Sequence, residues 1–266
     1  MAALISSFNN LFTSSPVITA SDTYAIKENL PEPYPGHFIT TKAEDFIKEN
    51  KLSHEHYDFV RDFGGQSRLI CGFYKPFIAG GFFRRWVEGQ PFEMKDYSNA
   101  GDIDVFSAFK KGSHPEDGYL DSVFNFVKNT YDGHTEVAYQ ENKNNNIYTD
   151  TYTFQIMNFM YHKPYNNNMS EAIIKNIETM DASINMCAYD FNNDSFIYHS
   201  EFINHVKSRN YKFNGSTRSH PKTAILRLEK FIKLGYNIDP SCSTDMAKFM
   251  ARNIHKIDEP DMYNLS

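Results

Sequence analysis

Two aspartates separated by a single residue form the most informative feature of the sequence. Asp102 and Asp104 flank Ile103, and an apolar run continues through Val105 and Phe106. This composition predicts a β-strand, in which residues two apart point to the same face, roughly 6.6 Å apart along the strand. Two carboxylates that face one point are typical ligands for a pair of divalent cations, about 3.5–4 Å apart, in phosphoryl or nucleotidyl transfer. The alternative is a solvated pair on an edge strand.

A glycine pair upstream of these aspartates predicts a phosphate site. Gly80 and Gly81 follow an apolar run and precede a predicted helix that carries Arg84 and Arg85. Glycine lets the backbone approach a ligand closely, and the start of a helix presents free N–H groups and a positive dipole end. Adjacent helical residues point about 100° apart, so we expect only one of the two arginines to reach a triphosphate. A solvated helix face is the alternative for both.

The glycine pair, the helix and the Asp-x-Asp strand, in this order, resemble the signature of the polymerase-beta-like nucleotidyltransferases. This superfamily includes tRNA nucleotidyltransferases, poly(A) polymerases and many small viral and bacterial members. Two downstream segments add to the resemblance. Met180–Asp190 is similar to the strand that carries the third carboxylate, and Arg227–Phe231 is similar to the helix that follows the head in viral and phage members.

The resemblance implies a metal-dependent enzyme that transfers a nucleoside monophosphate from an NTP to a hydroxyl and releases pyrophosphate. Asp102, Asp104 and Asp181 would be the catalytic residues and would bind Mg²⁺ or Mn²⁺, with Asp150 as the alternative third carboxylate. The expected nucleotide-binding residues are Gly80, Gly81, Arg84, Arg85, Asn185, Arg227 and Lys230.

Two of these expectations have specific alternatives. Asn185 shares a face with Asp181 only if the strand between them is regular. Arg227 and Lys230 lie one helical turn apart and share a face, but pairing with Glu229 or another surface acid would explain them equally well.

The sequence also departs from the family pattern. A gap at the long end for the family separates Gly81 from Asp102, so we expect an extra loop from Glu88 to Gly101 beside the site. Neither an arginine pair before Asp181 nor a base-selecting Glu-Asp-x-x-Arg helix is present. The NTP is therefore left open, and the acceptor could be an RNA 3′ end, a protein hydroxyl or another nucleotide.

Composition limits the class of protein. The 266 residues are 41% hydrophobic and 15% aromatic, which indicates a globular chain rather than a disordered one. The formal net charge of −6 excludes a global basic field, so a nucleic-acid acceptor would need a local patch. The odd number of cysteines, Cys71, Cys187 and Cys242, predicts buried thiols in a reducing cytoplasm. We expect neither a signal peptide nor a membrane helix, because no stretch approaches ~20 apolar residues.

The hydrophobic pattern predicts the elements that position these residues. We expect an extended N-terminal arm over residues 1–40, a mixed α/β nucleotidyltransferase head with a small mixed sheet flanked by helices over 41–198, and a helical C-terminal extension over 199–266. The expected helices are Ala43–Leu52, His54–Phe63, one from Pro115, Glu171–Thr179 capped by Ser170, Glu201–Arg209, Lys222–Leu234 and Thr244–Ile257. The expected strands include His134–Tyr139 and Tyr148–Phe159, with turns at Gly64-Gly65 and Asn142–Asn146.

A second hypothesis comes from another functional class. The chain could be a catalytically inactive descendant of the same fold, a viral or phage structural or interaction protein that binds a partner through its arm and its helical extension. The intact pair of Asp102 and Asp104 argues against this, because buried like charges repel and are costly to keep without a cation. The sequence does not determine the oligomeric state.

Overall fold

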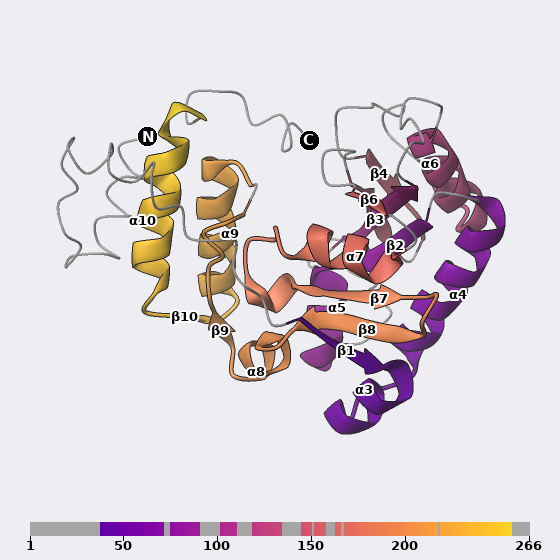
Figure 1. Ribbon diagram of the computed structural model, residues 1–266, viewed down its shortest axis with the longest axis horizontal. Helices are drawn as coiled ribbons and strands as arrows, with labels where there is room; N and C mark the ends of the chain where they lie inside the picture. Colours follow the sequence, from indigo (N-terminus) through magenta and orange to yellow (C-terminus); the bar gives the residue numbers. More distant parts are fainter. Residues whose placement is uncertain are drawn as a thin grey trace.

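A β-sheet with helices on both faces forms the framework of the molecule (Figure 1). The computed structural model describes residues 38–71, 75–90, 102–110, 119–134, 145–150, 152–157, 163–165, 168–217 and 219–256. Within these residues the strand order is β1-β8-β7-β2-β3-β5-β4, and β6 also pairs with β3. The strands are β1 (Phe38–Lys42), β2 (Lys75–Ala79), β3 (Ile103–Lys110), β4 (Asn145–Tyr148), β5 (Thr153–Ile156), β6 (Lys163–Tyr165), β7 (Cys187–Asp190) and β8 (Ser195–His199).

The sheet is mixed, as the sequence predicts. All neighbouring pairs from β1 to β3 are antiparallel, whereas β3 pairs in parallel with both β5 and β6, and β5 returns antiparallel to β4. The short strands β9 (Asn210–Tyr211) and β10 (Asn237–Ile238) form a separate parallel pair. The expected α/β architecture with a sheet flanked by helices is confirmed.

Helices cover both faces of the sheet. The helices are α3 (Ala43–Asn50), α4 (Glu55–Ile70), α5 (Gly81–Val87), α6 (Tyr119–Thr130), α7 (Met169–Ile177), α8 (Phe202–Lys207), α9 (Pro221–Lys233) and α10 (Cys242–Asn253), with 3-10 turns η2 (Ser183–Asn185) and η3 (Ile254–Lys256). The predicted helices at the C-terminal end, α8 to α10, are confirmed; α8 and α9 agree within one or two residues, whereas α10 starts two residues before the predicted start and ends at Asn253, four residues before the predicted end.

Alternation along β3 divides the core into two parts. Val105 points to a large aromatic cluster that contains Phe63, Phe83 and Phe196, on the face covered by α3 to α6. Phe106 points the other way and packs in a smaller cluster with apolar residues of α7. Asp104 shares the side of Phe106 because the two lie two residues apart. The candidate carboxylates therefore face α7.

Helix α4 corrects one sequence prediction. It continues through Gly64 and Gly65 to Ile70, where the sequence suggested a turn and then a strand or loop. A Cβ atom on Gly64 would lie 2.6 Å from the ring of Phe191, which is closer than packed atoms approach. Gly64 thus serves close packing between α4 and the β7–β8 hairpin and does not break the helix.

The segment around β4 and β5 corrects a second sequence prediction. The predicted strand from Tyr148 is interrupted: β4 ends at Tyr148, β5 returns antiparallel from Thr153, and the Thr149 hydroxyl accepts from the Tyr152 N–H at 2.8 Å. Asn145 and Asn146 belong to β4 rather than to the predicted turn. The fold of this hairpin follows from Thr149, whose side chain satisfies the turn backbone.

Helix α7 begins two residues earlier than expected. Its N-cap is Asn168, whose side chain accepts from the Glu171 N–H, and the predicted cap Ser170 lies inside the first turn. The Ser170 hydroxyl instead donates to the buried Asp190 carboxylate at 2.7 Å. Both side chains are good caps by type, and tertiary contact with Asp190 decides between them.

Several predictions fall wholly or partly outside the described residues. These are arm residues 1–37, loop residues 91–101, the start of the helix at Pro115 and strand residues 135–139. Residues 38–40 of the expected arm lie in β1, where Phe38 pairs with His199 of β8. The boundaries of the arm, head and extension stay predictions.

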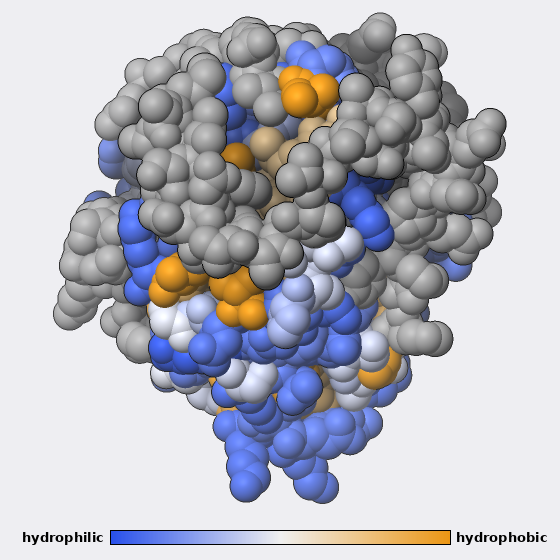
Figure 2. Space-filling model, turned by 90° about the vertical axis from the view of Figure 1, so that its left-hand side faces the viewer, coloured by the Kyte–Doolittle hydropathy of each residue, from blue (hydrophilic) through white to orange (hydrophobic). Residues whose placement is uncertain are grey.

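The described surface on the α10 side is mostly hydrophilic, and apolar residues gather there in separate groups (Figure 2). The expected burial of Cys71, Cys187 and Cys242 as free thiols is confirmed. Among the described helices, none has the length and apolar character that crossing a bilayer requires.

Candidate active site

The junction of β2 and α5 brings the glycine pair against a carboxylate. Gly80 has φ = +85° and stands at the N-cap of α5. A Cβ atom there would lie 3.1 Å from Asp104 Oδ2, so both the backbone conformation and the neighbouring carboxylate favour glycine. The Gly80 N–H donates to the Cys187 carbonyl at 2.9 Å, which ties the junction to β7.

Asp104 and Asp102 lie at the start of β3 in an environment that disfavours their charges. Asp104 is paired in register with Ala79, next to the glycine pair. Burial and the nearby Asp102 charge raise the pKa of Asp104 to about 7, against the opposing effect of Arg227, Arg85 and Lys230. Burial also raises the pKa of Asp102, opposed by Arg85 and Lys230. Among the described residues, no Lys or Arg side chain forms an ion pair with the carboxylate of Asp102 or Asp104.

The two arginines of α5 have different surroundings. Arg84 forms an ion pair with Glu88 at 2.8 Å, both side chains are 7% exposed, and its guanidinium lies 5.2 Å from the ring centroid of Phe231. Glu88 also accepts from the Tyr236 hydroxyl. The Arg84 charge is therefore neutralised where it lies.

Arg85 turns toward the carboxylates instead. Its Nη2 donates to the Asp102 carbonyl at 3.2 Å. Burial and the adjacent Arg84 charge lower the pKa of Arg85 to about 10, opposed by Asp104 and Asp102. We expected only one of the two arginines to reach the ligand. In this geometry Arg85 is the one that lies beside the carboxylates.

Asp181 is buried and fully engaged. One carboxylate oxygen accepts from Arg227 at 3.3 Å and from the Asn185 amide at 3.2 Å, and the other accepts from the Tyr211 hydroxyl at 3.4 Å. Asp181 is 1% exposed. Arg227 is half-exposed on α9 and forms its ion pair with Asp181. The alternative expectation was a surface ion pair with Glu229.

The segment around Asp181 is not the regular strand that the sequence suggested. The 3-10 turn η2 follows Ala182, and β7 begins only at Cys187. Asn185 nevertheless reaches Asp181, because the turn folds the chain back on itself. The expected regular strand is therefore wrong, and the turn rather than strand alternation brings the two residues together.

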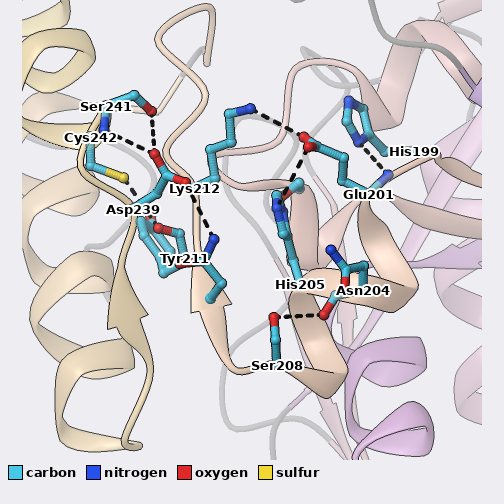
Figure 3. A network of polar contacts seen from close by, with 12 residues as sticks. His199, Glu201, Asn204, His205, Ser208, Tyr211, Lys212, Asp239, Ser241 and Cys242 are labelled. Carbon is cyan, nitrogen blue, oxygen red and sulfur yellow. Dashed lines mark hydrogen bonds and ion pairs between the residues drawn. The ribbon is translucent and has the colours of Figure 1, made fainter.

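A polar network at α8 and β9, in which Glu201 contacts both His205 and Lys212, lies next to this segment (Figure 3). The Ser183 hydroxyl lies 2.8 Å from His205 Nδ1, and the opposite ring nitrogen of His205 lies 3.8 Å from Glu201, which also pairs with Lys212 at 3.2 Å. Burial lowers the pKa of His205, with a smaller contribution of Lys212 in the same direction and an opposing one of Glu201. Ser183 is 1% exposed, so this arrangement positions η2 and is not a nucleophilic triad.

One pocket gathers all the predicted site residues. It has a volume of about 180 Å³ and lies where α5, β3, β5, α7, η2 and α9 meet. The predicted residues on its lining are Gly80, Gly81, Arg84, Arg85, Asp102, Asp104, Asp181, Asn185, Arg227 and Lys230. Asp150, the alternative third carboxylate, is exposed on the β4–β5 hairpin and is not on the lining. The catalytic and binding roles of these residues stay predictions.

The family follows from a match of the sequence. The chain matches the model for the Gabija anti-defense 2 family protein over residues 43–209. It belongs to this family. The matched segment contains the glycine pair, both aspartates of β3 and the Asp181 segment, and it ends before α9.

Solved structures share the fold of this Gabija anti-defense 2 family member. The Thermotoga maritima CCA-adding enzyme in complex with tRNA matches at 14% identity with a TM-score of 0.53, over 80% of this chain and 46% of that one. A CCA-adding enzyme with CTP matches at 14% identity with a TM-score of 0.54, over 82% and 46% of the two chains. An apo form matches at 13% identity with a TM-score of 0.52, over 82% and 47%.

These similarities establish a nucleotidyltransferase fold. The chain spans about half the length of these enzymes, and the low identity restricts the likeness to the fold. No curated protein matches the chain.

The residues of this pocket fit a cation only in part. Oxygen donors such as Asp102 and Asp104 suit Mg²⁺ or Mn²⁺, and a cation would relieve the repulsion that raises the pKa of Asp104. Asp181 lies on the same lining, and its oxygens accept from Arg227, Asn185 and Tyr211. Within the described part of the chain, no three His, Cys, Asp or Glu residues are grouped to hold a metal ion.

Sequence reasoning missed four polar residues of the pocket, Gln155, Asn176, Thr179 and Ser219. Gln155 on β5 is paired in register with Asp104, and Asn176 on α7 faces the same space. Gln155 could have been found only by knowing that β5 lies beside β3 in parallel. Asn176 carries no sequence signal, because it lies inside an ordinary amphipathic helix.

Proposed function

We propose that the protein transfers a nucleoside monophosphate from an NTP to a hydroxyl acceptor and releases pyrophosphate. One observation carries this proposal. Asp102 and Asp104 meet the glycine pair and the cations Arg85 and Lys230 in a single pocket, although these residues come from three separate segments of the chain. The fold shared with CCA-adding enzymes supports the same reaction class.

In this proposal the basic residues bind phosphate and the acidic residues bind the metal ion. Arg85 and Lys230 bind the phosphate oxygens of the NTP, and Gly80 keeps the space beside Asp104 open for them. Asp102 and Asp104 hold Mg²⁺ or Mn²⁺. When bound, the cation supplies the charge neutralisation that in-line phosphoryl transfer requires.

Asp181 has a supporting role in this proposal. Its ion pair with Arg227 directs that guanidinium toward the pocket, and its contact with Asn185 fixes η2. Arg227 then faces the developing phosphate charge from α9, opposite α5. The third carboxylate of the expected metal site is thus reassigned from binding a cation to positioning one of the phosphate ligands.

The acceptor follows from the family. We propose that it belongs to the Gabija defence system and that its modification is the anti-defense activity named in the family's description. This activity would take place in the cytoplasm of the host of a virus or phage that encodes the protein. A protein hydroxyl, an RNA 3′ end or another nucleotide each provides the chemical group that the reaction needs.

A labelling experiment tests the proposal. Purified protein is incubated with each α-³²P-labelled NTP, with Mg²⁺ or Mn²⁺, and with lysate of Gabija-containing cells. We expect label to enter one fraction with the wild type and not with Asp104→Asn. The fraction that is labelled (protein, RNA or small molecule) identifies the acceptor class. Equal labelling by both proteins would exclude these aspartates as the catalytic pair.

The non-catalytic hypothesis has one observation in its favour. Asp181 is satisfied by Arg227, and the described carboxylates do not form a three-residue metal site. In that case the pocket would bind a nucleotide or a partner without transfer. Saturable NTP binding without labelling of any lysate fraction, by wild type and Asp104→Asn alike, is its expected signature.

A further inference from the structure

The pocket has an uncharged end that the proposed transfer chemistry does not use. Asn176 of α7 and Gln155 of β5 line it, and its apolar lining comes from Phe106, Met157 and Met180. These uncharged side chains differ in chemistry from Arg85 and the aspartates on the same lining.

Asn176 presents a hydrogen-bond acceptor that has no partner. Its Nδ2 donates to the Ala172 carbonyl at 2.8 Å, which fixes the orientation of the amide because only the nitrogen can donate. Its Oδ1 is buried without a hydrogen-bond partner, and the residue is 2% exposed. A buried carbonyl oxygen without a partner costs stability, so a donor from a ligand is the expected compensation.

Gln155 presents a second acceptor on the adjacent strand. It is paired in register with Asp104, so the two side chains leave the same face of the sheet one strand apart. Its Nε2 donates to Asn146 Oδ1 at 3.2 Å, which leaves its Oε1 available. The uncharged end thus offers acceptors from two elements, β5 and α7, on one pocket lining.

We infer that this end of the pocket binds a nucleobase that carries an exocyclic amino group, with Asn176 Oδ1 accepting from that group. The inference rests on the proposed function for the class of ligand. Two acceptors disfavour a phosphate or a carboxylate, whereas the apolar lining suits a flat ring. Adenine, cytosine and guanine donate from an amino group, while uracil carries a carbonyl where cytosine carries its amino group.

The base belongs either to the NTP or to the acceptor. Because Gln155 lies one strand from Asp104, a base at this end would place its own nucleotide close to the reacting groups in both cases. Both sources present the same chemistry to Asn176.

The test compares cytidine with uridine, which differ at the group that Asn176 would recognise. Isothermal titration without metal measures both nucleosides against wild type, Asn176→Leu and a matched control, Asn253→Leu. Asn253 makes the same kind of helix contact, donating to the Phe249 carbonyl at 2.9 Å, but lies outside the pocket. We expect wild type and the control to prefer cytidine by about tenfold, the worth of one hydrogen bond, and Asn176→Leu to bind both equally.

The affinity ratio does not depend on the fraction of protein that is folded, so a destabilised variant remains informative. Gln155→Leu provides a second variant and should reduce the same ratio. A wild type that does not bind cytidine or binds both nucleosides equally, or an Asn176→Leu variant that keeps the preference, would overturn the inference.

A competition experiment identifies whether the base belongs to the NTP or to the acceptor. Comparing its result with the transfer assay tests the inference and the proposed function separately. Cytidine that still binds with a saturating non-hydrolysable NTP identifies the acceptor's base, and cytidine that is displaced identifies the base of the NTP; either result supports the inference. A cytidine preference without NMP transfer refutes only the proposed function. Transfer by a wild type without the preference refutes only the inference.

Discussion

The two acidic groups of the pocket differ in how their charge is compensated. Asp102 and Asp104 on β3 crowd each other, and burial and mutual repulsion raise the pKa of Asp104 to about 7. Asp181, on the opposite side next to η2, accepts from an arginine, an amide and a hydroxyl. The first pair is incomplete without a ligand, whereas the second site is complete in the folded chain. Under the proposed function, this difference separates residues that act on a ligand from residues that hold the pocket in shape.

The largest effect is expected for activity. Asp104→Asn should lower nucleotidyl transfer by at least about a hundredfold, because it removes a cation-binding charge from the reacting centre while keeping the side-chain shape. Asp150→Asn, on the exposed hairpin, is the matched control and should transfer at the wild-type rate. Initial rates with labelled NTP measure both. A similar loss in the two variants would mean that the distinction between pocket and hairpin carboxylates is wrong.

The next effect separates the two arginines of α5. Arg84→Ala should destabilise the protein by about 3 kcal/mol, since it leaves Glu88 buried without its ion-pair partner. Arg85→Ala should instead weaken NTP binding about tenfold with a smaller change in stability. Denaturant unfolding and NTP titration measure the two quantities. The reverse pattern would assign the phosphate contact to Arg84.

The pH dependence of stability tests the strain at Asp104. A carboxyl group whose folded pKa lies above its unfolded value binds more protons when folded, so its charge costs stability as pH rises from about 4 through 7. In the presence of a chelator, Asp104→Asn should therefore gain stability relative to wild type between pH 5 and pH 8, by on the order of 2 kcal/mol. His56, whose pKa burial and Arg85 lower to about 4, contributes to both proteins and largely cancels in this difference.

The smallest effect concerns Asp181. Asp181→Asn should cost about 1 kcal/mol of stability, because Arg227 is half-exposed and water can replace its partner. Its thermal stabilisation by added Mn²⁺ should equal that of wild type, whereas the response of Asp104→Asn should largely vanish. Thermal melts with and without Mn²⁺ measure both. A lost Mn²⁺ response in Asp181→Asn would restore Asp181 as a metal ligand.

Local patterns were sufficient for most of the elements near the site. The apolar run before Gly80, the helix with Arg84 and Arg85, and the strand of Asp104 all follow from periodicity and glycine conformation. Where prediction failed, a distant contact decided the outcome: Phe191 packs on Gly64 and keeps α4 continuous, and Asp190 attracts Ser170 away from the capping position.

The sequence by itself determined the types of chemical group at the site and the order in which the chain presents them. The hydrophobic pattern predicted the mixed α/β architecture. Motif spacing pointed to Asp102, Asp104, Arg84 and Arg85, because strand alternation and helix turns act over a few positions. The resemblance to nucleotidyltransferases added Asp181, Arg227 and Lys230.

Only the tertiary structure decided how the charges are shared. Arg227 pairs with Asp181 rather than with a neighbour on α9, and Arg84 is neutralised by Glu88 while Arg85 faces β3. Gln155 and Asn176 enter the pocket because β5 lies beside β3 and α7 covers that face. These pairings depend on distance and burial between remote segments, which no local pattern encodes.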